Sequence, residues 1–101
     1  MRANVYFTRE ITPEKVVELY RALGVELPGK VAVKVHSGEK GNQNFLRPEF
    51  WCPMVEEVHG TIVECNTAYG DAAGGVRDHT ESHRKLLQEH GWTKYFDVDL
   101  M

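Results

Sequence analysis

The chain is poor in the residues that define several protein classes. Only two of its 101 residues are cysteines, Cys52 and Cys65, and neither lies in a Cys-x-x-Cys pair, so the chain has no zinc or iron–sulfur motif of its own. No apolar run approaches the roughly 20 residues of a membrane-spanning helix, and the first ten residues, MRANVYFTRE, lack the apolar core of a signal peptide. We therefore expect a cytoplasmic protein, without a membrane partner, whose two thiols are reduced and buried.

Basic residues are in the minority. The chain has 12 Lys and Arg against 15 Asp and Glu, which gives a net charge of −3 and a pI near 5.9. Because nucleic-acid binding normally needs a basic surface, we expect no nucleic-acid partner. With 42% hydrophobic and 27% charged residues, the composition is that of a folded chain. Its length predicts one small domain over residues 1–101, with a single core.

Apolar strands alternate with helical segments along the chain. Thr12 and Pro13 are typical of a helix start, Gly24 and Gly60 are plausible helix ends, and Pro53 predicts that the second helix kinks or restarts there. The predicted strands are 4–8, 30–36, 61–66 and 96–100, and the predicted helices are 13–23, 48–59 and 79–90. The order β-α-β-α-β-α-β predicts a small three-layer α/β domain with a mainly parallel four-stranded sheet.

Two polar loops follow the second and third predicted strands, and parallel strands bring such loops to the same sheet edge. In the first loop Gly38 and Gly41 allow positive φ or close backbone approach, but their spacing matches neither GxGxxG nor GxxxxGK[ST]. The second loop begins at Asn66 and Thr67, which serve either a ligand or the backbone of the turn. The alternative to a binding site is a pair of solvated surface loops.

Lys34 lies within the second predicted strand, on the face shared by Ala32 and His36. A buried lysine is costly unless it is paired, so Lys34 is either functional or at the rim of the sheet. Asp97 and Asp99 in the last predicted strand are candidate partners, or they face water.

The helix at 79–90 places histidines along one side. His79 and His83 are four residues apart and can share a metal ion, although the HExxH motif is absent. A histidine that lines a pocket or binds a carbonyl group is the alternative.

Several blocks in order resemble one family. They are KVHSGE at 34–39, LRPE at 46–49, NTAYG at 66–70, Arg77, Thr80, His83 and EHGW at 89–92. Together they cover most of the chain from Val31 to Trp92 and resemble the domain-of-unknown-function family number 362, an iron–sulfur-associated group. The link 70–76 is longer or looser than in the family, and only Gly60 separates the second helix from the third strand.

The resemblance implies an α/β fold and a longer, ferredoxin-linked parent. In that architecture two 4Fe–4S clusters are bound C-terminal to a region like this one, so no cofactor is expected within this chain. The last predicted strand ends beside Met101, and such a strand normally feeds a further element. We therefore expect residues 1–101 to be the N-terminal part of a longer protein, or to end on an edge strand.

Three hypotheses about function follow. The leading one is an anionic-ligand pocket at the carboxyl ends of the strands, with Arg47 and Arg77 holding the anion and His36 or His83 transferring a proton. The expected ligand-binding set is Gly38, Glu39, Asn42, Arg47, Asn66, Thr67, Tyr69 and Arg77. The second hypothesis is a metal-binding domain that uses His36, Glu39, His79 and His83. The third is an assembly module that forms a homo-oligomer or pairs with a C-terminal domain.

Overall fold

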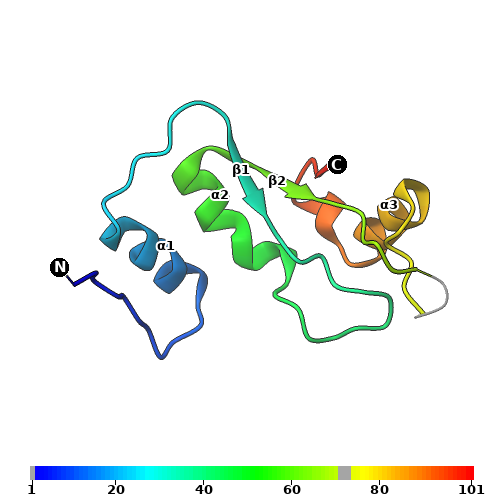
Figure 1. The fold of residues 1–101 in the computed structure, drawn as a ribbon, viewed down its shortest axis with the longest axis horizontal. Coiled ribbons are helices and arrows are strands. Elements are labelled where there is room, and N and C mark those ends of the chain that lie inside the picture. The colour runs from blue at the N-terminus through cyan, green and yellow to red at the C-terminus, as the bar shows by residue number, and fades with distance from the viewer. Residues whose placement is uncertain (1, 71–73) are drawn as a thin grey trace.

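The computed structural model describes residues 2–70 and 74–101 of the chain (Figure 1). Its helices are α1 (Pro13–Ala22), α2 (Cys52–Val58) and α3 (Thr80–Glu89), with short 3-10 helices η1 (Pro48–Trp51) and η3 (Trp92–Lys94). Its strands are β1 (Val31–Lys34), β2 (Gly60–Glu64) and β3 (Asp99–Leu100). They form one sheet in the order β1-β2-β3, in which both pairs are parallel. The chain is therefore an α/β protein with a small parallel sheet.

The first helix begins where its sequence predicts. The hydroxyl of Thr12 accepts a hydrogen bond from the Lys15 N–H at 3.2 Å, which satisfies one of the free donors of the first turn, and Pro13 occupies the first turn. Gly24 follows the helix with φ 62°. α1 packs against α2, and a bidentate ion pair from Arg21 to Glu57, at 2.9 and 2.6 Å, joins the two helices.

The region 48–59 is two helices rather than one. The 3-10 helix η1 gives way to α2 at Cys52, so Pro53 falls in the first turn of α2 and the missing N–H costs nothing. The restart, one of the two predicted outcomes, is thus confirmed. The prediction that Gly60 ends the helix is wrong, because His59 takes the left-handed turn with φ 49° and Gly60 begins β2. Gly60 serves packing instead, since a Cβ there would lie 2.8 Å from Val33 Cγ2.

The sheet has three strands within the described residues, so the predicted four-stranded β-α-β-α-β-α-β arrangement is wrong. The segment 4–8 has strand-forming residues but no neighbouring strand, and Val5 and Phe7 are 88% and 80% exposed. Strand propensity alone does not create a ladder partner. The last predicted strand, 96–100, shortens to Asp99–Leu100. The Phe96 N–H still donates back to the Trp92 carbonyl at 3.0 Å, so the start of the predicted strand belongs to the turn after η3. Part of the predicted loose link at 70–76, residues 71–73, lies outside the described residues.

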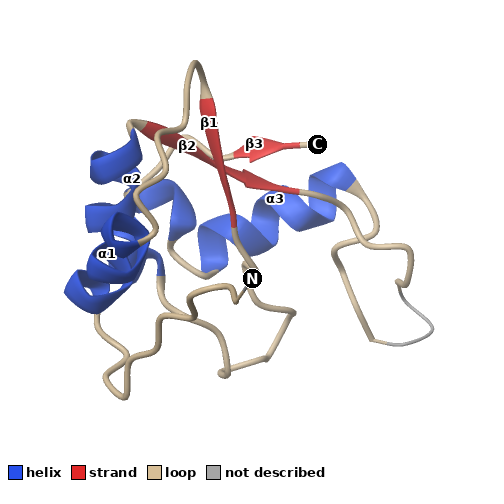
Figure 2. Ribbon diagram, turned by 60° about the vertical axis from the view of Figure 1, so that its left-hand side comes forward, coloured by secondary structure: helices blue, strands red, loops and turns tan. Residues whose placement is uncertain are grey.

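The helices lie on one side of the strands (Figure 2). Val33 of β1 and Ile62 of β2 share that side, in register, and pack with Val55 of α2 and Leu87 of α3. On the other side of the sheet Ala32, Thr61 and Asp99 are exposed. The structure therefore has two layers where the sequence predicted three.

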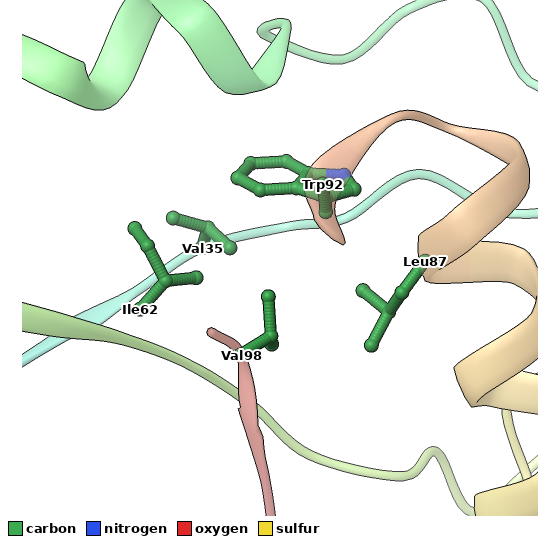
Figure 3. Close-up of a cluster of buried hydrophobic side chains, with 5 residues drawn as sticks. All are labelled: Val35, Ile62, Leu87, Trp92 and Val98. Carbon is green, nitrogen blue, oxygen red and sulfur yellow. The ribbon is translucent and has the colours of Figure 1, made fainter. Parts of the chain in front are cut away.

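The core lies between the sheet, α3 and η3 (Figure 3). Val35, Ile62, Leu87, Trp92 and Val98 form its buried cluster, and Trp92 is fully enclosed. Full burial of one such side chain stabilises a fold by about 1.5–3 kcal/mol. The indole N–H of Trp92 also donates to the carbonyl oxygen of Ser37 at 3.0 Å, which ties the core to the loop after β1. No helix in the described ranges is both long and apolar enough to cross a bilayer.

Candidate functional site

A buried carboxylate lies at the carboxyl end of β2. Glu64 is the last residue of that strand and is 1% exposed. Its Oε2 accepts hydrogen bonds from the Ser37 N–H at 3.0 Å and the Ser37 hydroxyl at 2.7 Å, while its Oε1 accepts from the Cys65 N–H at 3.0 Å. Lys34 Nζ completes the set at 2.5 Å from Oε1. Burial alone raises the pKa of Glu64, but the hydrogen bonds from Lys34 and Ser37 outweigh it and lower the pKa to about 2.

The ion pair with Glu64 explains the lysine within β1. The Lys34 side chain is 51% exposed, and its ammonium also donates to the Val35 carbonyl at 2.6 Å. Lys34 is thus at the rim of the sheet with its charge turned toward a buried anion. Asp97 and Asp99, the candidate partners from the sequence, are exposed and form no ion pair with it among the described residues.

Ser37 and His83 are both fully buried beside Glu64. The Ser37 hydroxyl oxygen lies 3.3 Å from His83 Nε2, and His83 Nδ1 lies 3.1 Å from Asn66 Oδ1. Asn66 is fixed in turn, because its Nδ2 donates to the Thr80 hydroxyl at 3.1 Å.

This order of hydroxyl, imidazole and orienting oxygen is the arrangement of an activated nucleophile. Here the hydroxyl is enclosed, and it lies closer to a carboxylate oxygen of Glu64 than to His83. Ser37 therefore acts as a link between Glu64 and His83 in this structure. Burial lowers the pKa of His83, and the positive charge of Arg77 acts in the same direction, although Glu64 opposes them. His83 is accordingly neutral at neutral pH.

Arg77 joins the two polar loops. Its Nε donates to Glu39 Oε2 at 2.9 Å, its Nη2 donates to the Tyr69 hydroxyl at 2.6 Å, and its Nη1 lies 3.5 Å from Glu64 Oε2. The other oxygen of Glu39 accepts the Val76 N–H at 3.0 Å. Burial raises the pKa of Glu39, but the Lys40 N–H and Arg77 outweigh it and lower the pKa below its usual value. The guanidinium group of Arg77 is therefore already paired within the protein.

Two glycines allow the loop after β1 to change direction, as its sequence predicts. Gly38 and Gly41 have φ of 87° and 76°, in the left-handed region. At Gly38 a Cβ atom would lie 2.5 Å from the ring of Phe45, so the close approach needs glycine as well.

The structure brings together most of the predicted site but not all of it. Hydrogen bonds or close polar contacts, of side chains or backbone, join eight of the predicted residues into one network. They are His36, Gly38, Glu39, Asn66, Thr67, Tyr69, Arg77 and His83. Thr67 serves the backbone of its turn, because its hydroxyl donates to the Tyr69 carbonyl at 2.8 Å.

The side chains of two predicted residues lie outside this network. Arg47 places its guanidinium 4.3 Å from the centre of the Phe45 ring and donates to Gln43. The Asn42 side chain accepts the Asn44 N–H locally at 2.8 Å, and only the Asn42 backbone reaches the network, through an N–H that donates to the Glu39 carbonyl at 2.9 Å. The expected pair of arginines around one anion is therefore not formed.

Sequence reasoning missed the centre of the cluster. Glu64 is the only acidic residue in the predicted strand 61–66, and its place at the carboxyl end of the strand was the signal that could have marked it. Ser37 carried no such signal. Its carbonyl oxygen accepts from His90 Nδ1 at 2.9 Å as well as from Trp92, so its importance depends on residues more than 50 positions away.

The residues of the metal hypothesis are separated. The His79 side chain is 78% exposed and lies near Asp78, whereas His83 is fully enclosed. Across residues 2–70 and 74–101, no group of three or more His, Cys, Asp or Glu side chains is placed to hold a metal ion. Both cysteines are free, but Cys65 is exposed, so its predicted burial is wrong. Cys52 is half-buried, and burial raises the pKa of its thiol.

No family model, curated protein or solved structure matches this chain. The function has to be inferred from the chemistry of the site.

Proposed function

We propose that this domain binds a small anion at the carboxyl ends of β1 and β2. The observation that carries the proposal is the direction of the hydrogen bonds. The carboxylates of Glu64 and Glu39 are held inside by protein donors, whereas three side chains near them keep a donor hydrogen that no described residue uses. These three are Lys34, His36 and Tyr69, and all three are exposed.

Lys34 supplies the accessible positive charge. An ammonium group has three N–H donors, and two of them are used by Glu64 and the Val35 carbonyl. The third is available to a ligand, because the side chain is 51% exposed while its partner Glu64 is 1% exposed. At this surface the cation of the pair is accessible and the anion is not.

His36 and Tyr69 add neutral donors. His36 Nδ1 accepts the Gly38 N–H at 3.1 Å and lies 3.4 Å from Arg77 Nη1, which can only donate, so the ring proton is on Nε2. The Tyr69 hydroxyl accepts from Arg77, which leaves its own proton free. Both side chains contact Arg77, and His36 lies two residues after Lys34, the last residue of β1.

A carboxylate or a phosphate monoester has the acceptor oxygens that such donors fit. In this proposal Arg77 positions Glu39, His36 and Tyr69 rather than contacting the anion, and Arg47 has no part. Fully enclosed His83 reaches a ligand only through Ser37 or Asn66, so its predicted role in proton transfer is not part of the proposal. The relation to the ferredoxin-linked family stays a prediction from the sequence.

The test is a titration with inorganic phosphate and with succinate, followed by amide chemical shifts. We expect Lys34→Gln and His36→Phe each to weaken binding about tenfold or more, since a hydrogen bond to a charged group is worth about 1.5–3 kcal/mol. Arg47→Gln is the matched control and should bind as the natural protein does. Binding that depends on Arg47 but not on Lys34 or His36 would place the anion elsewhere and defeat the proposal.

A further inference from the structure

Within the part of the chain that the structure describes, no strand lies beside the outer edge of β1. β1 pairs with β2 on one side only. The Val35 N–H donates to the Val63 carbonyl at 3.3 Å, so alternate residues from Val35 backward turn their backbone groups toward β2. The N–H and C=O groups of Ala32 and Lys34 therefore point to the open side. Unpaired backbone groups in a row are a template for another strand.

A strand-forming segment of the same chain is unpaired as well. Residues 4–8, NVYFT, combine β-branched and aromatic residues, and Val5, Tyr6 and Phe7 are 88%, 45% and 80% exposed. Figure 1 shows this segment running beyond α1, at the end of the molecule opposite α3 and away from β1. The ion pair from Arg21 to Glu57 and the packing of α1 on α2 hold the following helix in place.

The overall dimensions agree with an unpaired segment. The radius of gyration is 15.4 Å, with extents of 46 × 26 × 25 Å. A compact domain of 100 residues has a radius of gyration of about 13 Å. A single copy of the chain thus leaves both the apolar segment 4–8 and the outer edge of β1 without a strand partner among the described residues.

We propose that residues 4–8 of one copy add as a strand to the open edge of β1 in a second copy, and that the exchange is reciprocal. Reciprocal exchange closes a twofold dimer and satisfies both unpaired elements in both copies. Val5 and Phe7 fall on one side of such a strand and continue the half-buried row of Val31 and Val33.

The area approaches that of a stable dimer. Phe7 contributes one aromatic ring from each copy on the side of Val31 and Val33, whereas Tyr6 faces the other side of the sheet and is only 45% exposed. An aromatic side chain buries about 150–250 Å², so the two Phe7 rings remove up to roughly 500 Å² from water. The two Val5 side chains add to this area and the receiving strands lose a comparable surface, so the sum comes close to the roughly 1,200 Å² at which specific interfaces begin.

Light scattering after size exclusion tests the assembly. For the natural sequence we expect twice the chain mass of 11.5 kDa. For the double variant Val5→Lys, Phe7→Lys we expect the mass of one chain. The matched control, Val25→Lys with Leu27→Lys, changes two apolar residues of similar type that are 51% and 48% exposed in another loop, and should remain a dimer. A natural chain that is monomeric at all concentrations overturns the proposal.

Isotope-filtered NOE spectra identify the contact. Two differently labelled samples are unfolded, mixed and refolded together, and contacts between residues 4–8 and 31–34 are recorded. Contacts between differently labelled copies support the exchange. Contacts only within one copy would show that the segment pairs with its own β1, and a dimer without any such contact would show another interface; either result overturns the proposal.

Discussion

Glu64 and His83 share one hydroxyl group, that of Ser37. Its oxygen lies 2.7 Å from Glu64 Oε2 and 3.3 Å from His83 Nε2, and a hydroxyl carries a single proton. When His83 is neutral with its proton on Nδ1, facing the Asn66 oxygen, both neighbours of Ser37 are acceptors. The proton can satisfy only one of them at a time, so the protonation of Glu64 and His83 is coupled through Ser37.

The first prediction concerns acid stability. The pKa of Glu64 falls from an ordinary value near 4.5 to about 2 in the fold. A lowered carboxyl pKa stabilises the folded protein above pH 4.5, and this contribution, about 3 kcal/mol, disappears as pH falls toward 2. Urea unfolding from pH 6 to pH 2 should show this loss in the natural protein and not in Glu64→Gln. The exposed Glu81→Gln is the control, and an unchanged pH slope in Glu64→Gln contradicts the assignment.

The second prediction concerns the linking hydroxyl. Ser37→Ala removes a donor from Glu64 and the neighbour of His83 Nε2 inside a fully buried cluster. Leaving such groups short of a partner costs about 1–3 kcal/mol, which lowers Tm by about 4–8 °C for each kcal/mol in a domain of this size. Ser82→Ala removes a hydroxyl whose one hydrogen-bond partner among the described residues is the His79 carbonyl, at 3.1 Å, and should have a smaller effect. Equal melting temperatures of the two variants would contradict the role of Ser37.

The third prediction concerns His83 itself. Because burial lowers its pKa below 6.5, the folded protein prefers the neutral ring, and stability from this group is lost as pH falls below 6.5. An NMR titration should place the midpoint of His83 below 6.5 and show its proton on Nδ1. A midpoint at or above 6.5 would mean that Glu64 outweighs burial and Arg77.

The fourth prediction compares two glycines in left-handed conformation. Gly38 and Gly24 have φ of 87° and 62°, but only Gly38 faces a neighbour, the Phe45 ring. Replacing either by Ala adds the left-handed backbone cost of roughly 1–2 kcal/mol. Gly38→Ala should lose a further 1–3 kcal/mol, roughly, because the loop must move away from the ring. Chemical denaturation measures the difference, and equal losses would show that the loop yields freely.

Local signals predicted the local structure well. The cap at Thr12, the proline after it and the glycines of the first loop act on their own neighbours, so their outcome can be read from short sequence windows. The segment 4–8 could not be settled in this way, because a strand exists only with a partner and the partner is not local.

The candidate site was predictable in position and less so in content. Two loops that follow parallel strands meet at one edge, which placed His36, Glu39, Tyr69 and Arg77 near one another. Nothing in the sequence distinguishes Arg77, which is enclosed by partners, from Arg47, which lies on a phenylalanine ring. Glu64 was missed because its place at the centre of the buried hydrogen-bond cluster depends on donors from other segments of the chain.

The polar atoms of Ser37 bind residues from two distant parts of the chain. Its N–H and hydroxyl bind Glu64, 27 residues later, and its carbonyl binds His90 and Trp92, 53 and 55 residues later. A chain emerging from the ribosome therefore cannot form all of these contacts until residue 92 is free. The candidate site and the core both depend on this last part of the chain, because Trp92 belongs to the core and also binds Ser37.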